Sequence, residues 1–166
     1  MLVRDEYTVS PLDLDLPLTV SPSMVSPTRR IIEAKLGPVL EDDEDAIFRV
    51  AMTAHELLEN AAKYASDGKA RLELSVTPRD EGAIVRVVVT NNSTQEHIAE
   101  LGACYAEMNA AKDAMAHYFS LMRLNAKAGA LSRLGLARVR AEGEMEIEVD
   151  VVGERVKVVA SGIVAR

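Results

Sequence analysis

The segment 45–65 constrains this chain most, because it predicts a long helix with one apolar face. With consecutive residues about 100° apart, its apolar side chains gather on one side. They are Ile47, Val50, Ala54, Leu57, Leu58, Ala61 and Ala65. The polar side chains lie opposite, at Arg49, Thr53, Glu56, Glu59, Asn60 and Lys63. A helix of this kind must bury its apolar face against a second layer of structure.

Strands are predicted on both sides of this helix, from alternating apolar and polar residues. Within 10–20, leucines at every second position alternate with polar residues and Pro17, and the proline places this strand at a sheet edge. Segment 71–76 alternates apolar and polar residues, and 83–90 is a longer run rich in β-branched residues. Turn residues at 78–82 join the two, which predicts a hairpin. A second hairpin is predicted from 145–152 and 155–160.

Three further segments favour helices. One runs over about 27–36, where Ser26 or Thr28 is the expected cap and Pro27 suits the first turn. The stretch 95–128 is rich in Leu, Ala and Met and has no proline, and 131–142 follows with Ser132 as its expected cap. The order β-α-α-β-β-α-α-β-β predicts one α+β domain over residues 1–166. We expect a two-layer sandwich with a mixed, mostly antiparallel sheet and helices on one face.

Composition excludes several functions. Acidic residues number 26 and basic residues 19, for a net charge of −7, which argues against nucleic acid as a partner. No apolar run is long enough to cross a membrane. A single cysteine and the lack of an apolar leader favour the cytoplasm. One cysteine and three histidines also do not favour a structural zinc site.

Polar residues in the helix 45–65 carry the chemistry. Glu56 and Asn60 are four residues apart and therefore neighbours on the helix surface, and Lys63 lies one turn further on. A carboxylate beside an amide oxygen suits Mg²⁺, which keeps most of its waters and bridges to phosphates. A lysine one turn on would meet those phosphates. On spacing alone, a solvated helix face with i,i+4 pairs explains the same residues.

The full string Glu56-x-x-x-Asn60-Ala61-x-Lys63-Tyr64 resembles the N box of the histidine-kinase-like ATPase superfamily (GHKL). In layout, residues 10 to 160 are most similar to its anti-sigma-factor serine kinases. The resemblance implies the Bergerat-type α/β sandwich, with ATP and Mg²⁺ as cofactors. It implies that Asn60 holds Mg²⁺, that Glu56 is the general base, and that Lys63 lies near the phosphates.

Two departures from the family pattern bear on nucleotide binding. The family's first glycine box, Asp-x-Gly-x-Gly, is replaced by Asn91-Asn92-Ser93-Thr94-Gln95, so that only Asn91 is left to accept a hydrogen bond from adenine. The glycines that would let this loop approach a ligand closely are missing. The second box keeps only Leu134-Gly135-Leu136, and Arg133 replaces a glycine, where it would bind a phosphate or fill its place. We therefore expect weak or absent ATP binding.

Other reactive residues have simpler interpretations. His55, His97 and His117 are expected to be structural, although a phosphotransfer module for a histidine kinase would use one of them. Cys104 is expected to be a buried, inert thiol. Met108, Met115 and Met122 recur every seven residues and predict core, with a groove for a partner protein as the alternative.

Two functions follow as hypotheses. The first is a divergent regulator of bacterial signalling that binds a sigma factor, an anti-sigma antagonist or a response regulator. The alternative is an active Mg²⁺·ATP-dependent serine/threonine kinase of the anti-sigma type, with Glu56 as its base. A homodimer through the leading strand, and an unrelated α+β domain with a chance N-box match, are the remaining alternatives.

Overall fold

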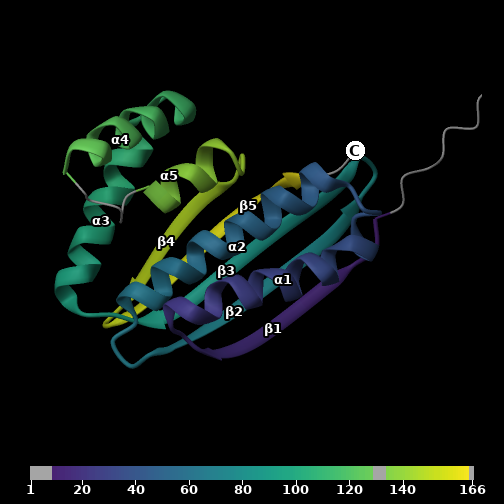
Figure 1. Ribbon diagram of the computed structural model, residues 1–166, viewed down its shortest axis with the longest axis horizontal. Coiled ribbons are helices and arrows are strands. Elements are labelled where there is room, and N and C mark those ends of the chain that lie inside the picture. The colour runs from purple at the N-terminus through teal and green to yellow at the C-terminus, as the bar shows by residue number, and fades with distance from the viewer. Residues whose placement is uncertain (1–8, 129–133, 165–166) are drawn as a thin grey trace, which may run out of the picture.

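The computed structural model describes residues 9–128 and 134–164 (Figure 1). Its strands are β1 (Leu12–Thr19), β2 (Lys69–Arg79), β3 (Gly82–Asn92), β4 (Glu146–Val152) and β5 (Arg155–Val164). Its helices are α1 (Pro22–Val39), α2 (Glu44–Tyr64), α3 (Gln95–Ala110), α4 (Ala114–Ala128) and α5 (Leu134–Ala141). The α+β architecture predicted from the sequence is confirmed, with one more helix than the predicted order because the stretch 95–128 is divided in two.

The five strands form one sheet in the order β1-β2-β3-β5-β4. Every pairing among the described residues is antiparallel, which makes the sheet more uniform than the mixed sheet we expected. The reason is visible after β1, where α1 and α2 form a helical hairpin that returns the chain to the same end. There the amide of Val20 donates to the carbonyl of Gly68, so β2 starts beside the end of β1. Strand β1 lies at an edge, as Pro17 predicts.

Alternation along the strands gives the sheet one apolar face. The leucines of β1 lie opposite Ala70, Leu72, Leu74 and Val76 of β2, and this face continues through Val85, Val87 and Val89 of β3. Helices α1 and α2 lie side by side across it (Figure 1). The face of α2 predicted to be apolar is the buried one, with Val50, Ala54, Leu57, Leu58 and Ala61 all at most 2% exposed. The predicted bounds of α2, 45–65, agree with Glu44–Tyr64 within one residue at each end.

Helix α1 begins five residues before its predicted start, so the prediction of a cap at Ser26 or Thr28 is wrong. Its N-cap is Ser21, with Pro22 in the first turn. The Thr28 hydroxyl instead donates to the carbonyl of Met24, one turn back within the helix. Buried residues continue at helical spacing beyond both predicted ends, from Val25 to Val39. Burial of this face outweighs the cost of the internal prolines, which lack a backbone N–H.

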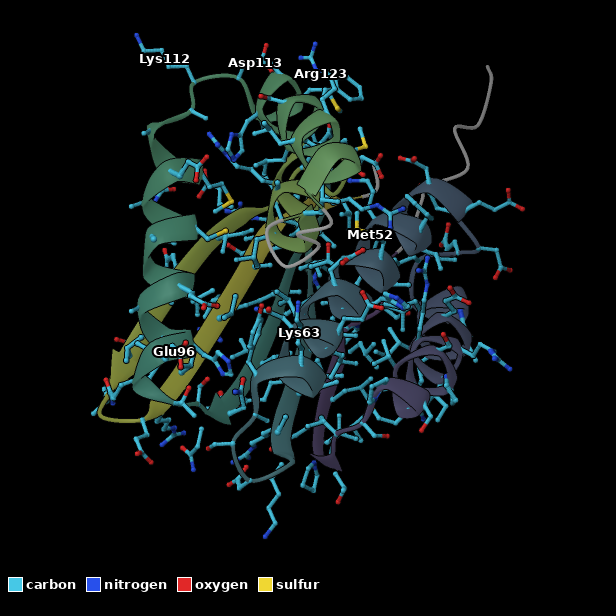
Figure 2. All side chains as sticks on the ribbon, turned by 60° about the vertical axis from the view of Figure 1, so that its left-hand side comes forward. Met52, Lys63, Glu96, Lys112, Asp113 and Arg123 are labelled. Atoms are coloured by element: carbon cyan, nitrogen blue, oxygen red, sulfur yellow. The ribbon has the colours of Figure 1, made fainter. Side chains whose placement is uncertain are left out.

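The region after β3 folds as two helices and a turn at 111–113, not as one long helix. Figure 2 shows Lys112 and Asp113 of this turn at the top of the molecule, and Glu96 in the lower part of α3. The guanidinium of Arg140 in α5 donates to the carbonyls of Met108 and Ala111 and so closes the end of α3. The predicted cap Ser132 lies outside the described residues. None of the described helices combines the length and apolar character that a membrane crossing requires.

Candidate functional site

A cavity of about 380 Å³ lies where the start of α1, the second half of α2 and the start of α5 meet. Four of the residues predicted for the site, Glu56, Asn60, Lys63 and Gly135, line it together. Pro22, Glu59, Ala62 and Leu136 complete the lining. This volume is within the range of small-molecule sites. Residues from α2 and α5 that are far apart in the sequence therefore share one cavity.

The carboxylate of Glu56 is held by an arginine from α5. The Arg138 guanidinium donates to Glu56 Oε1 at 3.1 Å and, through Nε, to Glu142 Oε2 at 2.9 Å. The Glu56 side chain is only 12% exposed, so this partner satisfies a charge that is largely withdrawn from water. Hydrogen bonding to Glu142, and also to Glu56, raises the pKa of Arg138. Glu56 thus lines the cavity as an ion-paired carboxylate.

Gly135 lies close to this same carboxylate. A Cβ atom at Gly135 would lie 2.8 Å from Glu56 Oε2, which is closer than real Cβ contacts come. The glycine at position 135 therefore lets α5 lie against Glu56 without displacing its carboxylate. Leu136, the next residue of α5, is buried in the core that the sheet forms with α1 and α2.

The remaining polar side chains lie along the open side of α2. Lys63 is exposed, and its Nζ atom lies 5.2 Å from the centre of the Tyr64 ring (Figure 2 labels Lys63). Glu59 Oε1 lies 3.7 Å from His55 Nε2, an i,i+4 pair on the same helix. Asn60 is half-buried and lines both this cavity and a second, smaller one. The donor set of Asn60, Glu56 and Lys63 fits a hydrated Mg²⁺ ion and phosphate oxygens.

The second cavity lies between α2, the end of β3 and the start of α3, and it holds only about 20 Å³. Asn91 lines this cavity, so the structure separates it from Glu56, Lys63 and Gly135. The Asn91 side-chain amide donates to the neighbouring carbonyl of Asn92 at 3.1 Å. His97, Ile98 and Leu101 line it from α3. A volume of about one water molecule does not accommodate a nucleotide base, so the residues here do not fit ATP.

The residues that replace the first glycine box begin a helix. Ser93 is buried, and its hydroxyl donates to the carbonyl of Tyr64 at 2.9 Å, while its amide donates to the carbonyl of Glu154 at 2.8 Å. Thr94 is the N-cap of α3, and its hydroxyl accepts from the amide of His97. Where a glycine-rich loop would leave room for a ligand, this chain starts α3 directly and turns its first residues toward α2.

The other predicted residues are placed as follows. Arg133 lies outside the described residues. Cys104 is half-buried against the main core, so the expectation of a fully buried thiol is not met. The methionines do not form one stripe, because the turn at 111–113 puts Met108 in α3 and the other two in α4. Met108 is 1% exposed and belongs to the core, whereas Met115 is 38% exposed.

Two contacts near the cavities were missed in the sequence. Arg138 has Glu142 four residues away, which predicts only a pair within one helix, and its contact with Glu56 spans 82 positions. His97, which was expected to be structural, packs on Tyr64 and lines the smaller cavity.

No family model matches the chain, and no curated protein matches it. Among solved structures, the chain is similar to one in the crystal structure of the SiaB-SiaC complex from Pseudomonas aeruginosa, with a TM-score of 0.62. The match is 15% identical and covers 91% of this chain and 89% of that chain. At this identity the likeness shows the fold, over nearly the whole length of both proteins.

Proposed function

We propose that this chain is a regulator of bacterial signalling that acts by binding another protein, on a histidine-kinase-like ATPase fold with weak or absent nucleotide binding. The observation that carries the proposal is the filled space beneath α3. That space is about 20 Å³ and is lined by side chains of α3, so a purine has no room there. A chain that had kept nucleotide turnover would need that space open.

A protein-binding role has a surface to act through. On α4, Met115 is 38% and Phe119 is 50% exposed, and these residues lie on one side of the helix, one turn apart. Solvent-exposed Met and Phe on a helix are typical of surfaces that bind other proteins. The similar fold found in the SiaB-SiaC complex belongs to a protein that was crystallised with a protein partner. We infer a signalling protein as the partner, such as a sigma factor, an anti-sigma antagonist or a response regulator.

Calorimetric titration of Mg²⁺·ATP into the full chain tests the nucleotide half of this proposal. We expect no saturable heat at millimolar nucleotide, and the same result for Asn60→Ala. Micromolar binding that Asn60→Ala abolishes would overturn it, because the cavity at α2 would then be a working nucleotide site.

A photo-crosslinking amino acid at position 119 tests the protein-binding half in the native host cell. We expect one dominant adduct with a signalling protein, absent when the same residue is placed at Glu73, on the sheet. Equal adducts from both positions, or none from position 119, would contradict the assignment of α4 as the binding surface.

An active serine/threonine kinase is the second candidate, because Glu56, Asn60 and Lys63 line one open cavity of about 380 Å³. In that role Glu56 would accept the proton of a partner's hydroxyl group. Arg138 already engages its carboxylate, so that ion pair would have to loosen first. Transfer of radiolabelled phosphate to a partner that Glu56→Ala abolishes would establish this function. A Glu56→Ala protein that is as active as wild type would exclude Glu56 as the base.

A further inference from the structure

Helix α4 belongs to a stretch of the chain whose charge is opposite to that of the whole. Residues 114–141 contain no aspartate or glutamate. The stretch carries five basic residues, namely Arg123, Lys127, Arg133, Arg138 and Arg140. Because the net charge of the chain is −7, the residues outside this stretch are strongly acidic. An acidic partner is therefore attracted to this part of the chain and repelled by the rest.

Among the described side chains of this stretch, Arg123 is the cation that remains open to a partner. Arg138 and Arg140 already donate to acceptors of the protein itself, in α2, in α5 and at the end of α3. Arg123 is exposed, and it makes no ion pair or hydrogen bond with another described residue. Figure 2 shows it at the top of the molecule, near the turn that holds Lys112 and Asp113. Arg123 can therefore meet a negative charge on a partner.

The solvent side of α4 combines this cation with apolar side chains. Met115, Phe119 and Arg123 follow one another at intervals of four residues, so they lie along one side of the helix. Met115 is 38% and Phe119 is 50% exposed, whereas Tyr118 and Leu121 are buried on the side that faces α5. The three residues span about 12 Å, at a rise of about 1.5 Å per residue. Such a ridge of side chains fits into the groove of another helix.

We propose that the solvent side of α4 binds an acidic amphipathic helix of the partner protein. Apolar side chains of that helix cover Met115 and Phe119, and a carboxylate beside them pairs with Arg123. This role of α4 rests on the proposed function and deepens it, because it names the chemistry of the partner. A second copy of the chain does not fit, since both copies would present the same positive side. An anionic membrane does not fit either, because it repels the acidic remainder of the chain.

The test is fluorescence anisotropy with two synthetic helical peptides that share one leucine stripe, flanked by glutamates in the first and by lysines in the second. We expect the full chain to bind the glutamate peptide at least about tenfold more tightly than Arg123→Glu does, because the reversed charge repels its carboxylates. Phe119→Ala should weaken the same binding at least about fivefold, because an exposed aromatic contact is lost. Arg123→Lys keeps the charge and should bind like wild type.

Arg86→Glu is the matched control for net charge. Arg86 is exposed on β3, on the face of the sheet away from the helices, and its reversal changes the net charge by the same amount. Because salt screens separated surface charges, this variant should bind the glutamate peptide within about twofold of wild type.

The absence of saturable binding of the glutamate peptide, or an equal loss in Arg123→Glu and Arg86→Glu, would overturn the proposal. Tighter binding of the lysine peptide that Phe119→Ala weakens would do the same. Sedimentation with phosphatidylserine vesicles, or self-association in light scattering, would assign the surface to a membrane or a second copy if Arg123→Glu abolished it. Failure of the proposed function is separate, because it appears as the lack of an adduct from position 119. An adduct together with peptide binding that ignores Arg123 would reject the acidic helix alone.

Discussion

At the scale of single residues, a contact made for packing can resemble a motif for ligand binding, as it does at Glu56, Arg138 and Gly135. The ion pair and the missing Cβ at Gly135 describe one contact, in which α5 closes over a carboxylate of α2. A glycine kept for phosphate binding and a glycine kept for this contact look identical in the sequence. Substitutions at these positions separate the two roles, because only the packing role of Gly135 depends on Glu56.

Gly135→Ala should cost less than about 1 kcal/mol, because its Cβ displaces only the carboxylate end of the flexible Glu56 side chain and the helix propensity of alanine offsets part of that cost. Gly102→Ala is the matched control, since a Cβ there meets nothing within 4 Å in the middle of α3. It should stabilise by about 0.5–1 kcal/mol through helix propensity. Urea denaturation measures both. In a Glu56→Ala background the cost at Gly135 should largely disappear, and an undiminished cost would mean that another contact requires the glycine.

Arg138→Gln should cost about 1–3 kcal/mol in unfolding free energy, because it leaves a mostly buried carboxylate without its charged partner. Glu142→Gln removes the more exposed partner of the same arginine and should cost less than about 1 kcal/mol. Denaturant unfolding of both variants gives the comparison. Equal effects would show that the Glu56 contact adds nothing beyond a surface ion pair.

At the scale of elements, the start of α3 decides how much space is left beneath α2. Ser93 and Thr94 convert the end of β3 into a helix cap, and the next residues of α3 close the space beneath α2. Arg140 holds the other end of α3 at the carbonyls of Met108 and Ala111. Helix α3 is therefore fixed at both ends by polar contacts, with its apolar residues facing the core between them.

Thr94→Ala should lower stability by about 0.5–2 kcal/mol, because the amide of His97 loses its cap. Ser21→Ala is the matched control at the start of α1, where the N-cap side chain makes no capping hydrogen bond. Its effect should stay within about 0.5 kcal/mol. Thermal unfolding followed by circular dichroism compares the two variants. A larger loss at Ser21 would refute this account of the two caps.

At the scale of the whole molecule, the described residues pack into two clusters of unequal size. The main cluster contains the sheet with α1 and α2, and the smaller one holds only Tyr118, Leu121, Ala137 and Ala141 as buried members. Helix α5 belongs to both, with Leu136 and Val139 in the main cluster and Ala137 and Ala141 in the smaller one. Helix α4 is thus attached to the rest through α5.

Amide hydrogen exchange should reveal this division. Helix α4 has few buried apolar neighbours, so it should open locally and exchange at least about tenfold faster than α2. Mass spectrometry of exchange at the level of peptides measures both helices in one experiment. Matching protection of α4 and α2 would show that the two clusters unfold as a single unit.

The sequence by itself determined the two-layer architecture and the site helix. Period-two leucines specify β1, and Pro17 specifies its place at an edge. The apolar stripe of 45–65 specifies α2 to within one residue at each end. These patterns are local and repeat along the segment, so short-range physics is enough to read them. The order of hairpins and helices then leaves few ways to cover one face of a sheet.

Only the tertiary structure decided what the site residues meet. Glu56, Asn60, Lys63 and Gly135 share a cavity because α5 packs on α2, whereas Asn91 lies in another cavity behind α3. The start of α1 was missed because burial outweighed the local preference of Pro27 for a first turn. Arg138 meets Glu56 across 82 positions, and His97 meets Tyr64 across the gap between two elements. Such contacts follow from how elements pack, because no local pattern records which side chains that packing brings together.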